Sequence, residues 1–242
     1  MSQIVKYKAY IGSLPPGKLT KEQLLVDELL LEEGEGLAVY YVPYEYVNER
    51  AKVMLIGITP GFTQMEVAIR SARDDLLRGV PPERIDENAK RLASFAGSMR
   101  VNLIRMLDQI GLPEAIGIRG SASLFEGNKA LLHTTSAIRY PVFKNGRNYT
   151  GHSPDMMKSA LLRSYTESIL LPELTAVKDA LVIPLGISVS GVIRAFVERG
   201  RLNGERCLFD MPHPSGANGH RGKQFDAAKA KMREQVKRWF DR

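Results

Sequence analysis

The chain has 242 residues, of which 44% are hydrophobic and 25% charged, proportions that are ordinary for a folded globular protein. This length favours one domain with a large core. The only cysteine, Cys207, excludes an internal disulfide and any site built from four thiolates. The 34 lysine and arginine residues exceed the 27 acidic ones, and the net charge of +7 favours a polyanionic partner, although a solvated basic surface has the same composition.

The first residues lack the apolar run of a signal peptide, and no stretch is long enough to span a bilayer. We therefore expect a cytoplasmic protein with no membrane partner. The sequence has no coiled-coil pattern and no apolar interface stripe, so we expect a monomer.

The first half of the chain predicts strands and helices in alternation. Residues 1–19 are expected to be irregular, and residues 19–33 to form a helix that a capping Thr20 begins. Residues 37–47 are rich in β-formers and predict an edge strand. Residues 51–58 form an apolar run typical of a buried strand, and residues 64–93 predict helices broken near Pro81.

The second half continues the alternation. The patterns predict a helix at 98–111, a strand at 129–138, one helix or two at 153–178, a strand at 179–186, a helix at 187–200, a strand and loop at 206–216, and a basic helix at 222–242. The predicted fold class is therefore α/β, with three αβα layers around a central, mostly parallel four-stranded sheet. We expect residues 1–50 to form an N-terminal extension packed on a core domain of residues 51–242.

Two short turns follow predicted strands and carry polar side chains. The first is Gly57-Ile58-Thr59-Pro60-Gly61, and the second is His213-Pro214-Ser215-Gly216. Ligands of parallel sheets bind beyond the carboxyl ends of the strands. We therefore expect these turns, together with the turn that follows residues 133–136, to meet at one edge and form a site.

Several other site types are excluded by their spacing. A nucleophile elbow requires glycine where Ser190 stands, and the segment before Lys129 lacks the glycine spacing of a P-loop. The four histidines show no zinc-binding spacing. We predict no metal and no organic cofactor.

The two turns resemble motifs of the uracil-DNA glycosylase superfamily. The mismatch-specific branch has Gly-Ile-Asn-Pro-Gly and Asn-Pro-Ser-Gly, so each turn differs from it at one position. The iron–sulfur branch is similar over residues 94–112, 135–143 and 170–186, and the resemblance covers about residues 50–220 in order. That branch holds its cluster with four cysteines, which this chain does not have.

The resemblance implies a monofunctional DNA glycosylase, which flips a base out of DNA and hydrolyses its N-glycosidic bond to leave an abasic site. The partner is then DNA. The role is base excision repair if uracil or another lesion is cut, and antiviral defence if a modified base of foreign DNA is cut. Two alternatives stay open: a catalytically silent DNA-binding relative, and a nucleoside or nucleotide N-glycosidase.

The resemblance implies His213 and Thr59 as the catalytic residues. An imidazole N–H at His213 would stabilise the departing base as an anion, or the ring would only cap its loop. Thr59 stands where the family has Asp, Asn or Glu to orient water, and a hydroxyl is a poor general base. Either leaving-group stabilisation suffices or another carboxylate assists, with Glu66, Asp155 and Asp210 as candidates; otherwise Thr59 is a turn cap on a silent scaffold.

The remaining candidates surround these two residues. Ser136 aligns with an Asn that reads uracil, and its shorter side chain suggests a larger, modified pyrimidine. Phe95 matches an aromatic that stacks on the flipped base, unless it is an ordinary core residue. Ala217 stands where the family has its duplex wedge, so strand insertion is expected to be weaker unless His220 or Arg221 fills that place. The expected base-binding residues are Gly57, Ile58, Pro60, Gly61, Phe62, Phe95 and Ser136, and the expected DNA contacts are Arg139, Lys144, Arg147, Ser215, Gly216, Ala217, Asn218, His220 and Arg221.

Overall fold

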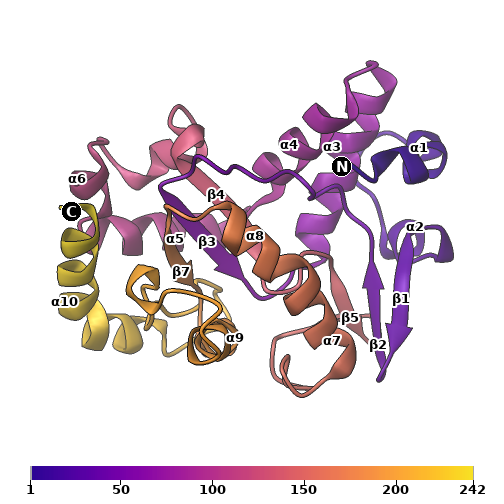
Figure 1. Ribbon diagram of the computed structural model, residues 1–242. Coiled ribbons are helices and arrows are strands. Elements are labelled where there is room, and N and C mark those ends of the chain that lie inside the picture. The colour runs from indigo at the N-terminus through magenta and orange to yellow at the C-terminus, as the bar shows by residue number, and fades with distance from the viewer. Residues whose placement is uncertain (1, 242) are drawn as a thin grey trace. The chain divides into compact units, whose positions relative to one another are not determined.

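The computed structural model describes residues 2–241 and divides the chain into two compact units (Figure 1). The first unit consists of residues 1–46, 59–96 and 138–165, and the second of residues 47–58, 97–137 and 166–242. Each unit is therefore assembled from three separate segments of the chain. The expected domain boundary near residue 50 stays a prediction.

The second unit contains the predicted parallel sheet. Its three strands are β3 (Val53–Gly57), β4 (Leu132–Ser136) and β7 (Leu181–Pro184), in the order β4-β3-β7. All five residues of β3 are buried, as expected for the central strand of a parallel sheet. The apolar run that ends at Gly57 is thus confirmed as the middle of the sheet.

A central sheet of four strands is not confirmed. At the position expected for the fourth strand, the structure has a single parallel bridge between Val182 and Cys207, with Leu208 N–H donating to the Val182 carbonyl at 2.8 Å. Asp210 then takes a positive φ of 75°, and Pro212 has no N–H to donate. Pairing therefore stops after one bridge.

The helices of the second unit come from all three of its segments. α9 packs on β7, and α5, α6 and α10 pack together (Figure 1). The buried Arg206 donates to the carbonyls of Leu174 and Val177 at the end of α8. The helices are α5 (Ser98–Gln109), α6 (Leu112–Ile116), η2 (Ser121–Phe125), η3 (Lys129–Leu131), the π-helical η4 (Thr166–Leu170), α8 (Leu171–Ala176), α9 (Ile187–Glu198), η5 (Gly204–Arg206) and α10 (Arg221–Phe240).

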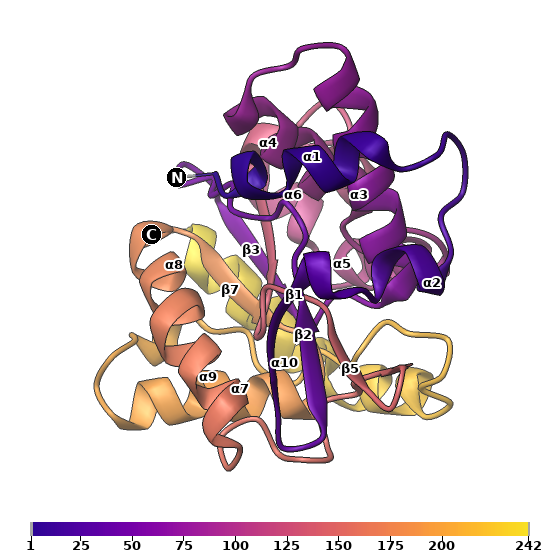
Figure 2. The ribbon, with the colours of Figure 1, turned by 90° about the vertical axis from the view of Figure 1, so that its right-hand side faces the viewer.

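The first unit contains an antiparallel sheet that the sequence predicts only in part. Its strands are β1 (Leu30–Gly34), β2 (Leu37–Tyr40), β5 (Val142–Lys144) and β6 (Arg147–Asn148), in the order β1-β2-β5-β6 (Figure 2). Asn145 and Gly146 join β5 to β6 with φ values of 51° and 67°, as a type I′ hairpin turn requires. Of the four strands, only β2 corresponds to a predicted one.

Two predictions for the N-terminal segment are wrong. Residues 1–19 are not irregular, because α1 (Ile4–Ser13) buries Ile4 and Ile11 on one face and packs on α3. The helix expected at residues 19–33 ends after one turn at α2 (Lys21–Leu24), although the Thr20–Gln23 capping box is present. Pairing of β1 with β2 outweighs the helical preference of the leucines that follow.

The other helices of the first unit agree with the sequence patterns. They are η1 (Asp27–Leu29), α3 (Phe62–Leu77), α4 (Pro82–Ala93) and α7 (Ala160–Tyr165). α3 and α4 pack closely, and the expected break near Pro81 separates them. None of the helices between residues 2 and 241 is long and apolar enough to cross a membrane.

Candidate active site

The carboxyl ends of the strands in the second unit bring several predicted residues to one edge. Ser136 pairs with Gly57 in register, and Ala137 N–H donates to the Gly57 carbonyl at 2.8 Å. β7 lies on the other side of β3, and Gly186 N–H beyond its end donates to the Met211 carbonyl at 2.8 Å. His213 follows two residues later. β3 and β7 lie between Ser136 and the His213 segment, so three strand spacings, about 14 Å, separate the two.

The backbone of Gly186 packs closely against the His213 side chain, which leaves no room for a side chain at residue 186. A Cβ at Gly186 would lie 3.0 Å from the His213 Cβ, and Gly186 has a φ of +87°. Ser215 N–H donates to His213 Nδ1 at 3.3 Å. Burial lowers the pKa of His213 to about 4, so the ring is neutral at neutral pH. Because Nδ1 accepts, Nε2 carries the proton and is the donor.

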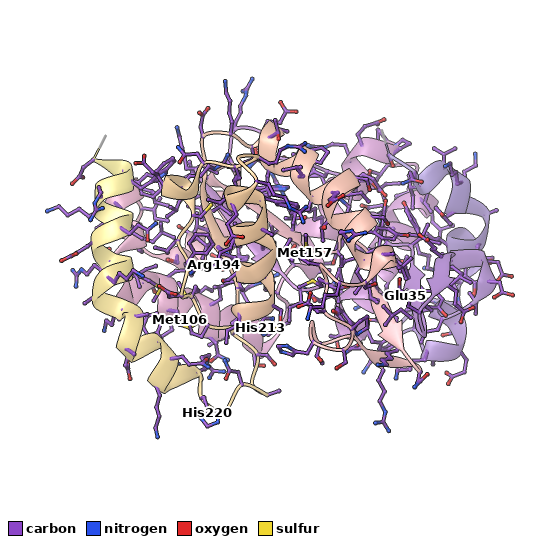
Figure 3. All side chains as sticks on the ribbon, turned by 60° about the horizontal axis from the view of Figure 1, so that its bottom comes forward. Glu35, Met106, Met157, Arg194, His213 and His220 are labelled. Carbon is purple, nitrogen blue, oxygen red and sulfur yellow. The ribbon has the colours of Figure 1, made fainter. Side chains whose placement is uncertain are left out.

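The loop that runs from His213 through His220 to α10 (Figure 3) is held by a side chain of its own and by side chains of α5 and α10. Arg221 donates to the Ser215 carbonyl at 2.7 Å, and Asn218 donates to the His213 carbonyl at 3.3 Å. From α5, Asn102 donates to the Pro214 carbonyl at 3.0 Å. Two of the expected DNA contacts, Arg221 and Asn218, therefore already hold loop carbonyls.

Other residues of this loop are open to solvent. Gly216, Ala217 and His220 are exposed, and Ala217 N–H donates to Ser215 Oγ at 3.2 Å. These positions are available for contact with a large ligand. Their role in DNA binding stays a prediction.

Thr59 lies in the first unit and has both functions of its hydroxyl engaged. Its O–H donates to the Tyr140 carbonyl at 2.7 Å, and its oxygen accepts from Val142 N–H at 3.1 Å. Thr59 can therefore accept one more hydrogen bond but has no proton left to donate. Because Thr59 and His213 belong to different units, their meeting at one site stays a prediction.

The residues after Thr59 are placed by a contact that the sequence did not indicate. Asn148 Oδ1 accepts from Phe62 N–H at 2.9 Å and so caps the start of α3. A Cβ at Gly61 would lie 3.2 Å from Asn148 Nδ2, so Gly61 makes room for this cap. The buried Pro60 precedes it in the turn.

Phe95 combines burial with an unusual backbone. It is 5% exposed, and its φ of +53° lies in the left-handed region that non-glycine residues rarely adopt. Such positions persist only where the surroundings hold them, and they are frequent in functional sites. The backbone conformation of Phe95 is thus of the kind found in functional sites, while its stacking on a base stays a prediction.

The expected basic contacts of the first unit lie near its hairpin. Lys144 and Arg147 face each other across β5 and β6, and both are exposed. Lys144 Nζ donates to the Ser153 carbonyl at 3.1 Å, and contact of this pair with DNA stays a prediction. Arg139, in contrast, interacts with Glu45 and Tyr140.

The three carboxylates proposed to assist Thr59 are all engaged elsewhere. Glu66 accepts from Leu19 N–H and from Arg70. Asp155 accepts from the backbone of its own turn, and Asp210 accepts from Lys231 at 2.8 Å. Each of these groups has a structural partner.

Sequence reasoning missed a pair of buried carboxyl groups in the first unit, Glu45 and Asp86. Tyr140 O–H donates to Glu45 Oε1 at 2.8 Å. Among the described residues, Glu45 Oε2 and Asp86 Oδ1 are buried without a hydrogen-bond partner. Burial and the charge of Asp86 raise the pKa of Glu45 to about 7, against the opposing effects of Tyr140 and Arg139. Burial likewise raises the pKa of Asp86, so the fold favours a proton on this pair.

The buried His133 belongs to the core of the second unit. Its Nδ1 accepts from Asn48 N–H, and its Nε2 lies 2.7 Å from Glu173, which also accepts from Thr135. Within residues 2–241, no group of three or more His, Cys, Asp or Glu side chains is arranged to hold a metal ion.

Comparisons with known proteins give one close relative. No family model matches the sequence. The Bacillus subtilis (strain 168) protein YoxB, described as uncharacterized, is 43% identical over 224 residues, which cover 92% of this chain and 88% of YoxB. Among solved structures, wild-type SMUG2 of Pedobacter heparinus is 10% identical, with 97% of this chain and 98% of that chain covered and a TM-score of 0.43. An overlap this loose carries no conclusion about fold or activity.

Replacing Gly186 with alanine should displace His213. The new Cβ meets the His213 Cβ and the backbone is strained, which together should cost about 1–3 kcal/mol of stability. Thermal unfolding and the NMR signals of the imidazole measure both effects. Gly191→Ala, in the same helix α9 with open space around the new Cβ, should be neutral or slightly stabilising. Equal behaviour of the two variants would contradict this role of Gly186.

Thr59→Val should destabilise the first unit. The isosteric change leaves the Tyr140 carbonyl and the Val142 N–H without their partner, at a cost of about 1–3 kcal/mol. Urea unfolding measures the loss. Thr63→Val, at an exposed position on α3, is the matched control and should leave the midpoint nearly unchanged.

Glu45→Gln should reduce the loss of stability as pH rises. Folding takes up a proton at Glu45 between the ordinary glutamate pKa of 4.5 and the folded pKa of about 7. The stabilisation is complete below the lower value and is lost as pH rises through the higher one. Glutamine stays neutral, so from about pH 5 to about pH 8 the variant should lose less stability than the wild type.

Urea unfolding at about pH 5 and at about pH 8 tests the expected effect of Glu45. Glu49→Gln makes the same chemical change at an exposed position and should follow the wild type. Parallel losses in the wild type and Glu45→Gln would mean that Glu45 does not take up the proton.

Proposed function

The chain belongs to the same protein family as YoxB of Bacillus subtilis, and we propose that it is a DNA glycosylase that hydrolyses the bond between a base and its sugar. The observation that carries the proposal is His213, a neutral imidazole at the carboxyl edge of the parallel sheet whose Nε2–H is a donor. The resemblance of its turn and of the Gly57–Gly61 turn to uracil-DNA glycosylase motifs supports the same function.

The chemistry requires stabilisation of a departing anion. The C1′–N bond breaks with its electron pair going to the base, and positive charge develops on the sugar. A donor aimed at a base oxygen stabilises that negative charge, and in a site without bulk water one such donor accounts for about 10²–10³ in rate. Because His213 is already neutral, its Nε2–H can donate to the anion with no prior deprotonation of the ring.

Water then adds to C1′, and the proton that it releases goes to the departed base anion, so that the base leaves as a neutral molecule. In this proposal Thr59 binds the water by accepting one of its hydrogens, since its own O–H is already given to Tyr140. Thr59 does not take the proton, because a hydroxyl is too weak a base at neutral pH. The rate enhancement in this proposal therefore comes mainly from stabilisation of the departing base anion, and no cofactor is involved.

The proposed substrate is a pyrimidine in DNA, with a modified pyrimidine favoured over uracil. Ser136 stands at the end of β4. The uracil-DNA glycosylase superfamily has there an Asn whose amide reads uracil, and the shorter side chain of Ser136 leaves more room. The exposed Lys144 and Arg147 support contact with phosphates. Repair and defence against foreign DNA both fit such a substrate.

Two other functions compete with this proposal. The engaged hydroxyl of Thr59 favours a catalytically silent DNA-binding relative, because the site then has no general base to activate water. A nucleoside or nucleotide N-glycosidase would use the same donor on a small substrate. Incubation with single-stranded and duplex DNA carrying uracil, mismatched thymine, hypoxanthine or glucosylated hydroxymethylcytosine, followed by alkali, separates the three. Strand breaks support the glycosylase, salt-sensitive binding without breaks supports the silent relative, and base release from nucleosides alone supports the third.

His213→Ala should lower the cleavage rate by about a hundredfold or more, because the departing anion loses its donor. His152→Ala, at an exposed histidine of the first unit, is the control for loss of an imidazole. Independently of activity, ¹⁵N NMR should find His213 neutral with its proton on Nε2 from about pH 5.5 to about pH 8. Unchanged turnover in His213→Ala would remove this residue from the reaction.

A further inference from the structure

Large hydrophobic side chains are rarely exposed among residues 2–241, and only two of the exposed ones belong to the second unit. Between residues 2 and 241, five are exposed: Val5, Leu77, Leu92, Val101 and Ile187. The first three belong to the first unit. Val101 and Ile187 belong to the second, with exposed fractions of 57% and 80%, and Ile187 is the most exposed of the five.

Both of these residues are next in sequence to a residue that contacts the His213 segment. Ile187 is the first residue of α9 and directly follows Gly186, whose backbone lies against the His213 Cβ. Val101 is the fourth residue of α5 and precedes Asn102, which donates to the Pro214 carbonyl. Ile187 is thus an exposed apolar side chain one residue from the glycine that packs on the imidazole.

A single exposed isoleucine is ordinary, but its position here is informative. A base can leave a duplex only if something stabilises the stack that it leaves, and proteins that deform DNA use apolar side chains for this purpose. The loop that should supply this wedge has Ala217 there, a side chain too small to replace a base. Ile187 is one residue from the glycine that positions His213 and has the missing bulk.

We propose that Ile187 is the duplex wedge of this protein, entering the base stack beside the nucleotide that is drawn out toward His213. The inference rests on the proposed function. It assigns to Ile187 the preference of the protein for duplex over single-stranded DNA.

Charge identifies DNA as the occupant of this apolar surface. The second unit has 19 lysine and arginine residues against 13 aspartate and glutamate residues, so it carries +6 of the chain's net charge of +7. A basic unit that also exposes an apolar side chain suits a nucleic acid, whose phosphates and bases offer both kinds of contact. A protein or membrane partner would call for a wider apolar patch.

The test uses a signal that does not depend on cleavage. A duplex oligonucleotide carries 2-aminopurine beside a mismatched pair, and its fluorescence rises when the base unstacks. Ile187→Ala should weaken duplex binding and the fluorescence rise by about ten- to a hundredfold, the value of burying one isoleucine side chain. Binding to single strands should change little, because there is no ordered stack to enter.

Matched variants complete the experiment. Leu77→Ala removes an equally large exposed side chain from the first unit and should behave as the wild type, and Ile187→Leu should restore the signal. A duplex signal in Ile187→Ala equal to that of the wild type would overturn the proposal. So would sedimentation showing that Ile187→Ala turns a dimer into a monomer, since the side chain would then cover a second copy of the chain.

The outcomes for the wedge and for the glycosylase are separable. If the wild type cleaves no base but its duplex signal depends on Ile187, the proposed activity fails and the wedge stands. If the wild type cleaves duplex DNA and Ile187→Ala cleaves it equally well, the wedge fails and the activity stands.

Discussion

The close approach of the Gly186 backbone to the His213 side chain is the constraint on which the candidate site depends. Gly186 follows the end of β7 by two residues, donates to the Met211 carbonyl, and directly precedes α9, all with a φ that other residues rarely adopt. The same glycine therefore connects a strand to a helix and leaves room for the imidazole. The orientation of His213 is a property of the sheet edge and not only of its own loop.

The environment of His213 also determines which proton it carries. Burial keeps the ring neutral, and the Ser215 N–H occupies Nδ1, so the remaining nitrogen is a donor. The arginine at the start of α10, Arg221, donates to the loop carbonyls instead. The loop thus gains rigidity from an arginine that the sequence alone suggests as a phosphate contact.

The sequence predicts the elements whose signals are local. The apolar run at residues 51–58 is the central strand, the break near Pro81 separates two helices, and the segment after Gly186 forms a helix. Gly57 and Ser136 lie at strand ends as expected, and the register pairs them. Periodicity and turn chemistry suffice for these because neighbouring residues determine them.

What the sequence does not predict depends on partners far along the chain. β1 forms instead of a longer helix because β2 pairs with it, and the fourth strand is reduced to one bridge by local turn geometry. Asn148 caps a helix 86 residues away, and Tyr140 joins Thr59 through its carbonyl to Glu45 through its phenol. A pattern of residue types carries no record of such pairings, so the carboxyl pair of Glu45 and Asp86 could not be foreseen.

The hydrogen bonds of Thr59 have a stereochemical consequence. Because its hydrogen is fixed on Tyr140, a water molecule can reach the hydroxyl only by pointing one of its own hydrogens at it. The electron pairs of that water then face away from the threonine. Such a contact selects the orientation in which water attacks an electron-poor carbon, and it does so without any change in charge on the protein.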